Sequence, residues 1–331
     1  MDKFSDKLLD WYKINKRQLP WRNSNNPYYV WISEIILQQT KVSTGLKYFN
    51  TFVSKYPTIF DLSSSTEEEV LLIWQGLGYY SRAINILKTA KVVTNKYDGI
   101  FPNVYNDLIK LPGIGDYTAS AILSICFNKP YPVIDGNVYR VLSRYFDVNQ
   151  PINKHASKKI FHDLAKSTLD LKNPGDYNEA LMEFGALNCK PLKPFCHTCV
   201  LNEKCLSFKK NIVSLRPVKV QKKQKKVRFF NYLVPFDLDN NTLIIKREDN
   251  DIWKGLYEFP LIETSKILNR DDLICMYLLP SWAKQDGIFI SKIYEKTHYL
   301  THQELRIIFW LFKNVNHCLL YTSDAADDLL C

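Results

Sequence analysis

The sequence lacks long apolar runs, and this absence limits where the chain can act. No stretch approaches the roughly 18 consecutive apolar residues that a transmembrane helix requires. The amino terminus, MDKFSDKLLDWYK, is charged and amphipathic, and it lacks the apolar core and small-residue cleavage site of a secretory signal. We therefore expect neither a membrane-spanning nor a secreted protein, but a soluble cytoplasmic one.

Acidic residues are too few to balance the basic ones. The 331 residues include 34 Asp and Glu against 44 Lys and Arg, which gives a formal net charge of +10. This excess favours an anionic partner, and nucleic acid leads because no membrane-directed segment is present. Hydrophobic residues make up 46% of the chain, a globular composition, and the length suffices for two or three domains.

Apolar residues in the first 208 positions recur at three- and four-residue spacing, which predicts a mainly helical region. The predicted helices include residues 67–74, 81–97, 117–127 and 177–187. Acidic residues are then absent from 209–228, a segment with nine Lys and Arg residues that we interpret as an exposed basic linker. Such a linker is either a solvated tether or a contact to DNA phosphates, and the two roles are compatible.

Beyond the linker the pattern changes to strands, so residues 229–317 predict a second, smaller α/β domain. The predicted strands are residues 229–236, 242–246, 288–294 and 305–312. The last stretch, 318–331 (CLLYTSDAADDLLC), fits neither pattern and resembles the translation of a sequencing adaptor. We leave it out of the fold prediction and expect the natural carboxyl terminus to differ.

Four of the eight cysteines lie within 17 residues, spaced Cys-x6-Cys-x2-Cys-x5-Cys. Four thiolates so close together provide the ligands of a [4Fe–4S] cluster. We therefore predict this cofactor on Cys189, Cys196, Cys199 and Cys205. A zinc site is the alternative, but four-cysteine zinc sites usually come as two separated Cys-x2-Cys pairs, and only one is present here. Cys126 and Cys275 lie in apolar stretches and are predicted to be buried thiols.

Two glycines two positions apart separate the predicted helices 104–110 and 117–127. The segment Leu111-Pro112-Gly113-Ile114-Gly115 allows a tight turn whose backbone N–H groups point outward at a helix start. This geometry suits a DNA phosphate. A turn that only joins two helices is the alternative.

Two carboxylates occupy apolar surroundings. Asp135 interrupts the run 133–138 and is either a functional acid or the cap of the following helix. Glu34 shares one helical face with Trp31 and Ile35. Ionisation is costly in so apolar a segment, and desolvation would raise the pKa of Glu34 toward that of a general acid. The alternative, an exposed Glu on an amphipathic helix, is weakened by these neighbours.

With the hairpin, the following Asp and the four cysteines in this order, residues 1–208 resemble the endonuclease III superfamily of helix-hairpin-helix DNA glycosylases. Within it they are most similar to the MutY branch, which removes adenine opposite 8-oxoguanine. The matching stretches are LPWR (19–22), WISEIILQQTKV (31–42), GLGYYSRA (76–83), LPGIGDYTA (111–119), DGNVYRV (135–141) and NEALMEFGA (178–186). The resemblance implies a six-helix barrel with a helical iron–sulfur domain, and a monomeric, nucleoid-associated enzyme of base excision repair. Its partner would be double-stranded DNA with A:8-oxoguanine or A:G mispairs.

One position separates the branches of this superfamily. Its bifunctional lyases carry a lysine nucleophile where this chain has Tyr117, and a tyrosine cannot form the Schiff base that β-elimination requires. The resemblance thus implies a monofunctional enzyme that flips adenine out of the duplex. Glu34 would protonate the base at N7 and later activate water, while Asp135 would stabilise the oxocarbenium-like sugar. Tyr117 and Asn137 would support these two acids.

The resemblance also implies contacts around the extruded adenine and the lesion pair. The adenine pocket would be lined by Arg17, Leu19, Trp21, Arg22, Val42 and Glu179. Leu19, Trp21 and Val42 are equally compatible with an ordinary core. Gln39 and Tyr79 would wedge into the base stack, where aromatic stacking is worth about 1–3 kcal/mol per base.

Residues 229–317 resemble the carboxyl-terminal Nudix-like domain of the same branch, mainly through WKGLYEFP at 253–260. The Arg-Glu-x2-Glu-Glu helix that binds magnesium in Nudix hydrolases is missing, so we predict recognition without nucleotide hydrolysis. In the family a Phe-Ser-His loop reads 8-oxoguanine, and here the matching segment is 298–302. Thr301 and His302 are its candidate contacts, and a polar turn between strands is the alternative.

Two other functions compete with adenine excision. An endonuclease III-like glycosylase and lyase would act on damaged pyrimidines and would need an amine nucleophile. A catalytically silent DNA-binding protein would keep the cluster and the second domain but remove no base.

Overall fold

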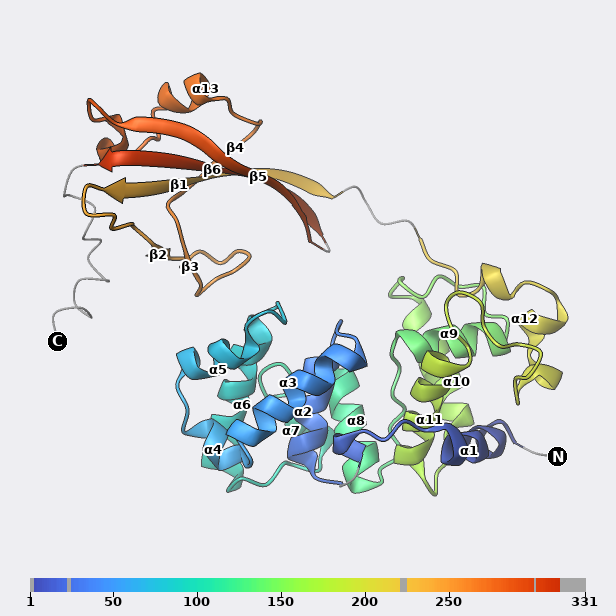
Figure 1. Ribbon diagram of the computed structural model, residues 1–331. Helices are drawn as coiled ribbons and strands as arrows, with labels where there is room; N and C mark the ends of the chain where they lie inside the picture. Colours follow the sequence, from blue (N-terminus) through green and yellow to red (C-terminus); the bar gives the residue numbers. More distant parts are fainter. Residues whose placement is uncertain (1–2, 23–24, 221–224, 301, 316–331) are drawn as a thin grey trace. The chain divides into compact units, whose positions relative to one another are not determined.

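The computed structural model describes residues 3–22, 25–220, 225–300 and 302–315. It divides into two compact units, Met1–Gln221 and Lys222–Cys331 (Figure 1). The predicted artefact at 318–331 lies outside the described residues. Among the residues described, no helix is both long and apolar enough to cross a membrane.

The first unit is built from helices. In chain order they are α1 (Phe4–Asn15), η1 (Pro20–Arg22), α2 (Pro27–Leu37), α3 (Val42–Lys55), α4 (Ile59–Ser63), α5 (Glu67–Trp74), α6 (Ser81–Tyr97), α7 (Tyr105–Leu108), α8 (Asp116–Phe127), α9 (Gly136–Tyr145), α10 (Ser157–Thr168), α11 (Pro174–Leu187), η2 (Asn202–Lys204), α12 (Leu206–Lys209) and η3 (Val213–Leu215). The predicted helical region is thus confirmed.

Two separate hydrophobic cores divide this unit into lobes (Figure 1). The first, here called the α2–α8 lobe, packs around Trp31, Phe52 and Trp74. The second combines α1 with α9, α10 and α11 around Leu8 and Phe184, and we call it the α9–α11 lobe. Helix α11 packs against α8, so the lobes meet along these two helices.

Local sequence explains how the helix that carries Glu34 begins and why it is enclosed. Pro27 occupies the first helical position of α2, and the Asn26 side chain caps it by accepting the Tyr28 N–H at 2.9 Å. Eight of the eleven residues of α2 are buried, because its sequence is apolar on nearly every side. The helix therefore holds Glu34 inside the unit.

The segment 209–228 differs from the exposed linker that we expected. The Ile152 N–H donates to the Val218 carbonyl at 3.0 Å, and Arg216 pairs with Asp147 at 2.7 Å. Residues up to 220 thus lie against the α9–α11 lobe, and Lys226 already begins the first strand. The charge of the segment did not indicate this packing, because the acid that pairs with two of its basic side chains, Asp147, lies elsewhere in the sequence.

The second unit is an α/β unit, as predicted. Its strands are β1 (Lys226–Asp237), β2 (Ile245–Lys246), β3 (Tyr257–Glu258), β4 (Leu261–Thr264), β5 (Phe289–Tyr299) and β6 (Gln303–Val315), with helices α13 (Arg270–Ile274) and η4 (Ser281–Lys284). Four strands form a sheet in the order β4-β1-β6-β5, in which β1 runs parallel to β6 and the other pairs are antiparallel. Cys275, predicted to be buried, is exposed at the end of α13.

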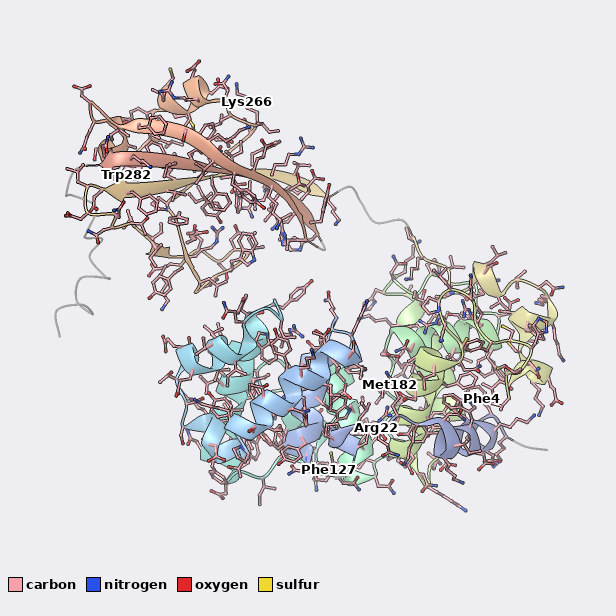
Figure 2. The ribbon with its side chains drawn as sticks, in the orientation of Figure 1. Phe4, Arg22, Phe127, Met182, Lys266 and Trp282 are labelled. Atoms are coloured by element: carbon pink, nitrogen blue, oxygen red, sulfur yellow. The ribbon has the colours of Figure 1, made fainter. Side chains whose placement is uncertain are left out.

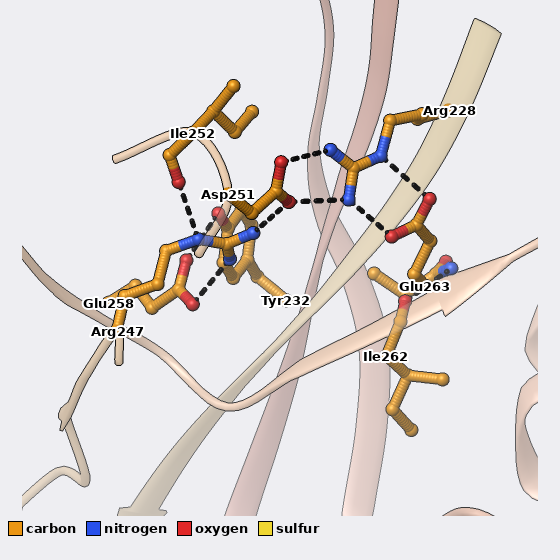
Figure 3. Close-up of polar contacts among 9 residues, drawn as sticks. Arg228, Tyr232, Arg247, Asp251, Ile252, Glu258, Ile262 and Glu263 are labelled. Carbon is orange, nitrogen blue, oxygen red and sulfur yellow. Dashed lines mark hydrogen bonds and ion pairs between the residues drawn. The ribbon is translucent and has the colours of Figure 1, made fainter. Parts of the chain in front are cut away.

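A network of charged side chains fastens the segment 247–258 to this sheet (Figure 3). Arg228 on β1 pairs with Asp251 at 2.7 Å and with Glu263 at 2.5 Å. Arg247 pairs with Asp251 at 2.8 Å and with Glu258 at 2.7 Å. Both guanidinium groups are buried, and their acidic partners satisfy the charge that burial would otherwise penalise.

Candidate active site

Glu34 is enclosed at the junction of the two lobes. Its side chain is 9% exposed, and desolvation raises its pKa to about 7. The Tyr117 hydroxyl of α8 interacts with the carboxyl and lowers its pKa, whereas the charges of Glu179 and Asp135 raise it further. A carboxyl group with this pKa is largely protonated below neutral pH, as a general acid requires.

Asp135 stands immediately before α9 and accepts hydrogen bonds there. Its carboxylate accepts the Val138 N–H at 2.7 Å and the Asn137 side-chain amide at 2.6 Å. It therefore caps the helix, which was one of its two predicted roles. Burial raises the pKa of Asp135, and these donors together with Arg140 oppose the rise by favouring the anion. The capped carboxylate stays partly exposed and faces the charge of Glu34.

An ion-pair network joins the segment before α2 to α11. Glu183, with a side chain 1% exposed, pairs with Arg17 at 2.7 Å and Arg22 at 3.0 Å. Arg22 also lies 3.4 Å from Glu179. The Glu179 carboxylate in turn accepts a hydrogen bond from the Tyr12 hydroxyl at 2.7 Å. Burial raises the pKa of Glu179, while hydrogen bonds from the two arginines lower the pKa of Glu183 to about 2. Figure 2 labels Arg22 of η1 and Met182 of α11.

The remaining residues of the predicted pocket lie in or against a hydrophobic core. Leu19 and Trp21 are 5% and 6% exposed inside the core of the α2–α8 lobe, where Trp21 meets Phe49 edge to face. Val42 packs against the same core. All three residues thus contribute to this core, and their place in an adenine pocket stays a prediction.

The two predicted wedge residues contact each other on the surface. The Tyr79 hydroxyl donates to the Gln39 side-chain oxygen at 2.9 Å, and both residues have a left-handed backbone, with φ of 50° and 59°. Arg82 fixes the backbone just before each of these residues, because its guanidinium donates to the carbonyls of Gln38 and Gly78 at 2.8 and 3.2 Å. Left-handed backbone costs energy for residues other than glycine, so this geometry is held by its surroundings.

The hairpin forms the predicted turn and leads into α8. Gly113 adopts a φ of 75°, which favours glycine, and Gly115 caps the helix that starts at Asp116. Ile114 is buried, whereas both glycines are exposed. The Thr89 hydroxyl donates to the Pro112 carbonyl at 2.7 Å and fixes the turn to α6.

The four clustered cysteines line one cavity together with Arg144. Arg144, 3% exposed on α9, donates to the Cys189 sulfur at 3.4 Å and to the Lys190 carbonyl at 2.7 Å. The Leu201 N–H donates to the Cys199 sulfur at 3.4 Å. Burial raises the pKa of the Cys199 thiol to about 11. In the ranges described above, no three His, Cys, Asp or Glu side chains form a site for a metal ion.

In the second unit, the predicted reader segment 298–302 begins in the last two residues of β5 and ends just before β6. The Leu300 N–H donates to the Gln303 carbonyl at 2.9 Å and closes the turn. His298 lies 6.0 Å from the Trp253 ring, and His302 is exposed. Thr301 lies outside the described residues.

Several residues around the site were missed by sequence reasoning. They are Tyr12, Arg82, Arg140, Arg144, Met182 and Glu183. Glu183 offered the same signal as Glu34, an acid inside an apolar helical stretch. The arginines gave no such signal, because only the fold shows that their guanidinium groups are enclosed by carbonyls.

Comparisons with known proteins agree on one family. Residues 32–167 match the HhH-GPD superfamily of base excision DNA repair proteins. The chain is 38% identical over 314 residues to the adenine DNA glycosylase of Buchnera aphidicola from Schizaphis graminum, covering 92% of this chain and 86% of that protein. It is 37% identical over 313 residues to that of Arabidopsis thaliana (82% and 50%) and 41% identical over 212 residues to the human one (61% and 39%).

Solved structures resemble about three fifths of the chain. A thermostable thymine-DNA glycosylase is 30% identical with a TM-score of 0.58, covering 62% of this chain and 95% of that one. An endonuclease III bound to DNA shares the fold at 24% identity and a TM-score of 0.54, covering 63% and 94%. Since the relative from Buchnera aphidicola is matched over most of its length, the chain belongs to the adenine DNA glycosylases of the HhH-GPD superfamily.

Proposed function

We propose that this adenine DNA glycosylase flips adenine out of DNA where it is mispaired with 8-oxoguanine or guanine, and hydrolyses its glycosidic bond. The observation that carries the proposal is the pair of carboxyl groups at the lobe junction, Glu34 and Asp135. Glu34 is buried with a pKa raised to about 7. Burial also raises the pKa of Asp135, but hydrogen-bond donors that favour its anion oppose that rise. Two acids in different environments can divide the roles of proton donor and anion.

In this mechanism the proton of Glu34 moves to N7 of the base while the glycosidic bond breaks and its electron pair leaves with adenine. Positive charge then develops on the sugar, and the Asp135 carboxylate stabilises it. Glu34, now ionised, accepts a proton from the water that adds to the anomeric carbon. Tyr117 lowers the pKa of Glu34 through its hydroxyl, and Asn137 orients Asp135 through their 2.6 Å hydrogen bond.

A direct test replaces each acid by its amide and measures single-turnover excision from A:8-oxoguanine duplexes. We expect Glu34→Gln and Asp135→Asn each to lower the rate by at least roughly a hundredfold, the contribution of a positioned acid or base. Glu68→Gln, on the exposed side of α5, is the matched control and should leave it unchanged. Full excision by Glu34→Gln would contradict the assignment, and no excision by the wild-type chain would favour a silent DNA-binding protein.

The same duplex separates this proposal from a lyase. Tyr117 provides no amine at the position of the lyase nucleophile, so borohydride should trap no Schiff base. Substantial trapping would instead support an endonuclease III-like enzyme.

For DNA binding, we propose that the hairpin of residues 112–115 (Pro112, Gly113, Ile114, Gly115) contacts a phosphate. Its exposed glycines stand where α8 begins, and the helix start favours an anion. The net charge of +10 supports this contact with the nucleoid DNA. DNA-binding titrations at increasing salt concentration measure this phosphate contact, because replacing it weakens binding to all DNA sequences alike.

We further propose that the cysteine cavity binds a [4Fe–4S] cluster, with Cys189, Cys196, Cys199 and Cys205 as ligands. The four sulfurs line one cavity, and N–H donors from Arg144 and Leu201 reach two of them, as suits thiolate ligands. When bound, the cluster would cross-link the loop 189–205 through its four cysteines. Iron and sulfide content of the purified chain tests the assignment, and zinc in stoichiometric amount would overturn it.

For the second unit, we propose a Nudix-like domain that recognises 8-oxoguanine and hydrolyses no nucleotide. The β5–β6 turn and the neighbouring Trp253 would supply the contacts, with Thr301 and His302 as candidates. Replacing His302 by Ala should lower excision opposite 8-oxoguanine more than excision opposite guanine. An equal reduction on both substrates would contradict a reading role.

A further inference from the structure

One arginine of α6 joins two segments that are distant in sequence. A terminal nitrogen of Arg82, Nη1, donates to the carbonyls of Ile35 and Gln38, each at 2.8 Å, where α2 ends. The other terminal nitrogen, Nη2, donates to the carbonyls of Leu77 and Gly78 at 3.4 and 3.2 Å, in the loop before α6. The last carbonyls of a helix have no partner inside it, so a single guanidinium satisfies both the end of α2 and this loop.

The residues that follow these two segments form an exposed pair. Gln39 and Tyr79 each come directly after a carbonyl that accepts from Arg82, and Tyr79 is 48% exposed. The Arg82 guanidinium also lies 5.5 Å from the centre of the Tyr79 ring. An exposed aromatic ring on a backbone that is already fixed suits stacking on a DNA base, because little of it must be ordered on binding.

We propose that Arg82 is a positioning residue for adenine extrusion, because it holds Gln39 and Tyr79 in the geometry in which they enter the base stack. Its planar fork sends hydrogen bonds in two directions at once, which the compact ammonium of lysine does not reproduce. Both wedge residues have a left-handed backbone, which residues other than glycine keep only where their surroundings hold it. Arg82 then acts on extrusion and not on cleavage of the glycosidic bond. This inference rests on the proposed extrusion of adenine and on the predicted wedge role of the two residues.

An alternative route would pass through Glu34, because Ile35 is its neighbour on α2. If Arg82 only held that helix in place, its replacement would disturb the acid and not the wedge. The test therefore follows extrusion without bond cleavage, and then asks whether the effect needs the two wedge side chains.

The experiment uses the full chain and an A:8-oxoguanine duplex whose target adenosine carries fluorine at the 2′ position. The fluorine disfavours positive charge on the sugar, so the bond stays intact, and a 2-aminopurine beside the adenine becomes brighter when adenine leaves the stack. Arg82→Lys should slow this fluorescence rise at least roughly tenfold, since a misplacement of about 1 Å can cost about a hundredfold. Arg270→Lys, at an exposed arginine that also donates to a carbonyl, is the matched control and should leave the rate unchanged. An unchanged rate in Arg82→Lys would overturn the proposal.

A double-mutant cycle decides whether the effect passes through the wedge. In a chain with Gln39→Ala and Tyr79→Ala, Arg82→Lys should change the excision rate of ordinary adenine by less than about twofold, because the groups it positions are gone. An equal loss in both backgrounds would mean that Arg82 acts through the fold or through Glu34, and would overturn the proposal. Arg82→Gln takes the place of Arg82→Lys if urea unfolding shows that the lysine variant does not fold.

Failure of the function proposed above would give a different result. A wild-type chain that produces no fluorescence rise and excises no adenine would contradict extrusion itself. A normal rise that Gln39→Ala and Tyr79→Ala together leave unchanged would remove the wedge role and this inference with it, while adenine excision would stand.

Discussion

Two buried glutamates at the lobe junction have pKa values shifted in opposite directions, because their neighbours differ. Glu183 lies between two guanidinium groups, which lower its pKa to about 2. Glu34 has one arginine at its site and two acids, and desolvation raises its pKa to about 7. The first carboxylate fastens the segment 17–22 to α11, while the second is available for chemistry.

Removing the charge of Glu183 should destabilise the fold. Glu183→Gln leaves Arg17 and Arg22 without their shared partner, and breaking a buried pair costs about 3–5 kcal/mol. Because the folded pKa is depressed, this contribution is present above the unfolded pKa of about 4.3 and is lost as pH falls toward 2. Urea unfolding at pH 7 and pH 3 measures both effects. Glu203→Gln, at an exposed pair with Lys7, is the control and should change much less.

Glu34 should show the opposite pH dependence. Its folded pKa is raised, so its contribution is fully present below the unfolded pKa and is lost as pH rises through about 7. Glu34→Gln mimics the neutral acid, and above pH 7 it should be more stable than wild type by roughly 2–4 kcal/mol. Near pH 4 the two proteins should unfold at similar urea concentrations. Equal stability at both pH values would mean that the site does not penalise the carboxylate.

Single residues were predictable where the signal lies in nearby sequence. The enclosure of Glu34 follows from the apolar stretch around it, and that expectation is confirmed by its 9% exposure. The prediction for Cys275 was wrong because the apolar stretch around it is buried only in part: Leu273 is buried, whereas Ile274 and Tyr277 are exposed together with Cys275 at the end of α13. Arg140 and Arg144 donate to carbonyls more than forty residues away, those of Gly185 and Lys190, and no local pattern indicates these partners.

Among the elements, α9 and α11 approach closely at one glycine. A Cβ added at Gly185 would lie 2.6 Å from the Asn137 Cβ and 3.1 Å from its backbone oxygen. Asn137 carries the hydrogen bond to Asp135, so a push at this point displaces the capped acid.

Gly185→Ala should therefore lower both stability and excision. Overpacking of this kind costs about 1–3 kcal/mol, which urea unfolding measures, and the excision rate should fall with it. Gly136→Ala offers a matched helical glycine with nothing within 4 Å, and it should be neutral or slightly stabilising. If both substitutions behaved alike, close packing at Gly185 would not be the cause.

Helices were easier to predict than strands. Residues 67–74 and 81–97 form α5 and α6 with the predicted bounds, because spacing and capping are local properties. The strand predicted at 242–246 shrinks to two residues, and the one at 288–294 extends to Tyr299. Strand length depends on the pairing partner, which is β3 for the first of these strands and β6 for the second, and that partner is set by tertiary structure.

At the scale of the whole molecule, the two units have separate cores, and we expect each to carry its own function. A fragment of residues 1–220 keeps both lobes and every residue of the proposed active site. We expect it to fold, to excise adenine, and to lose roughly tenfold in its preference for 8-oxoguanine over guanine, or about 1.4 kcal/mol. Single-turnover rates on the two duplexes measure this ratio. An unchanged ratio would remove the reading role from the second unit.

The position of α1 has a consequence for how the chain matures during synthesis. Tyr12 and its acceptor Glu179 are 167 residues apart, and the core around Leu8 consists mostly of residues from α9 to α11. The α2–α8 lobe can assemble as soon as its own residues emerge from the ribosome. Helix α1 must wait for α11, roughly ten to thirty seconds at ordinary rates of translation. We therefore expect α1 to dock much later than it is made, leaving its apolar side open to chaperones meanwhile.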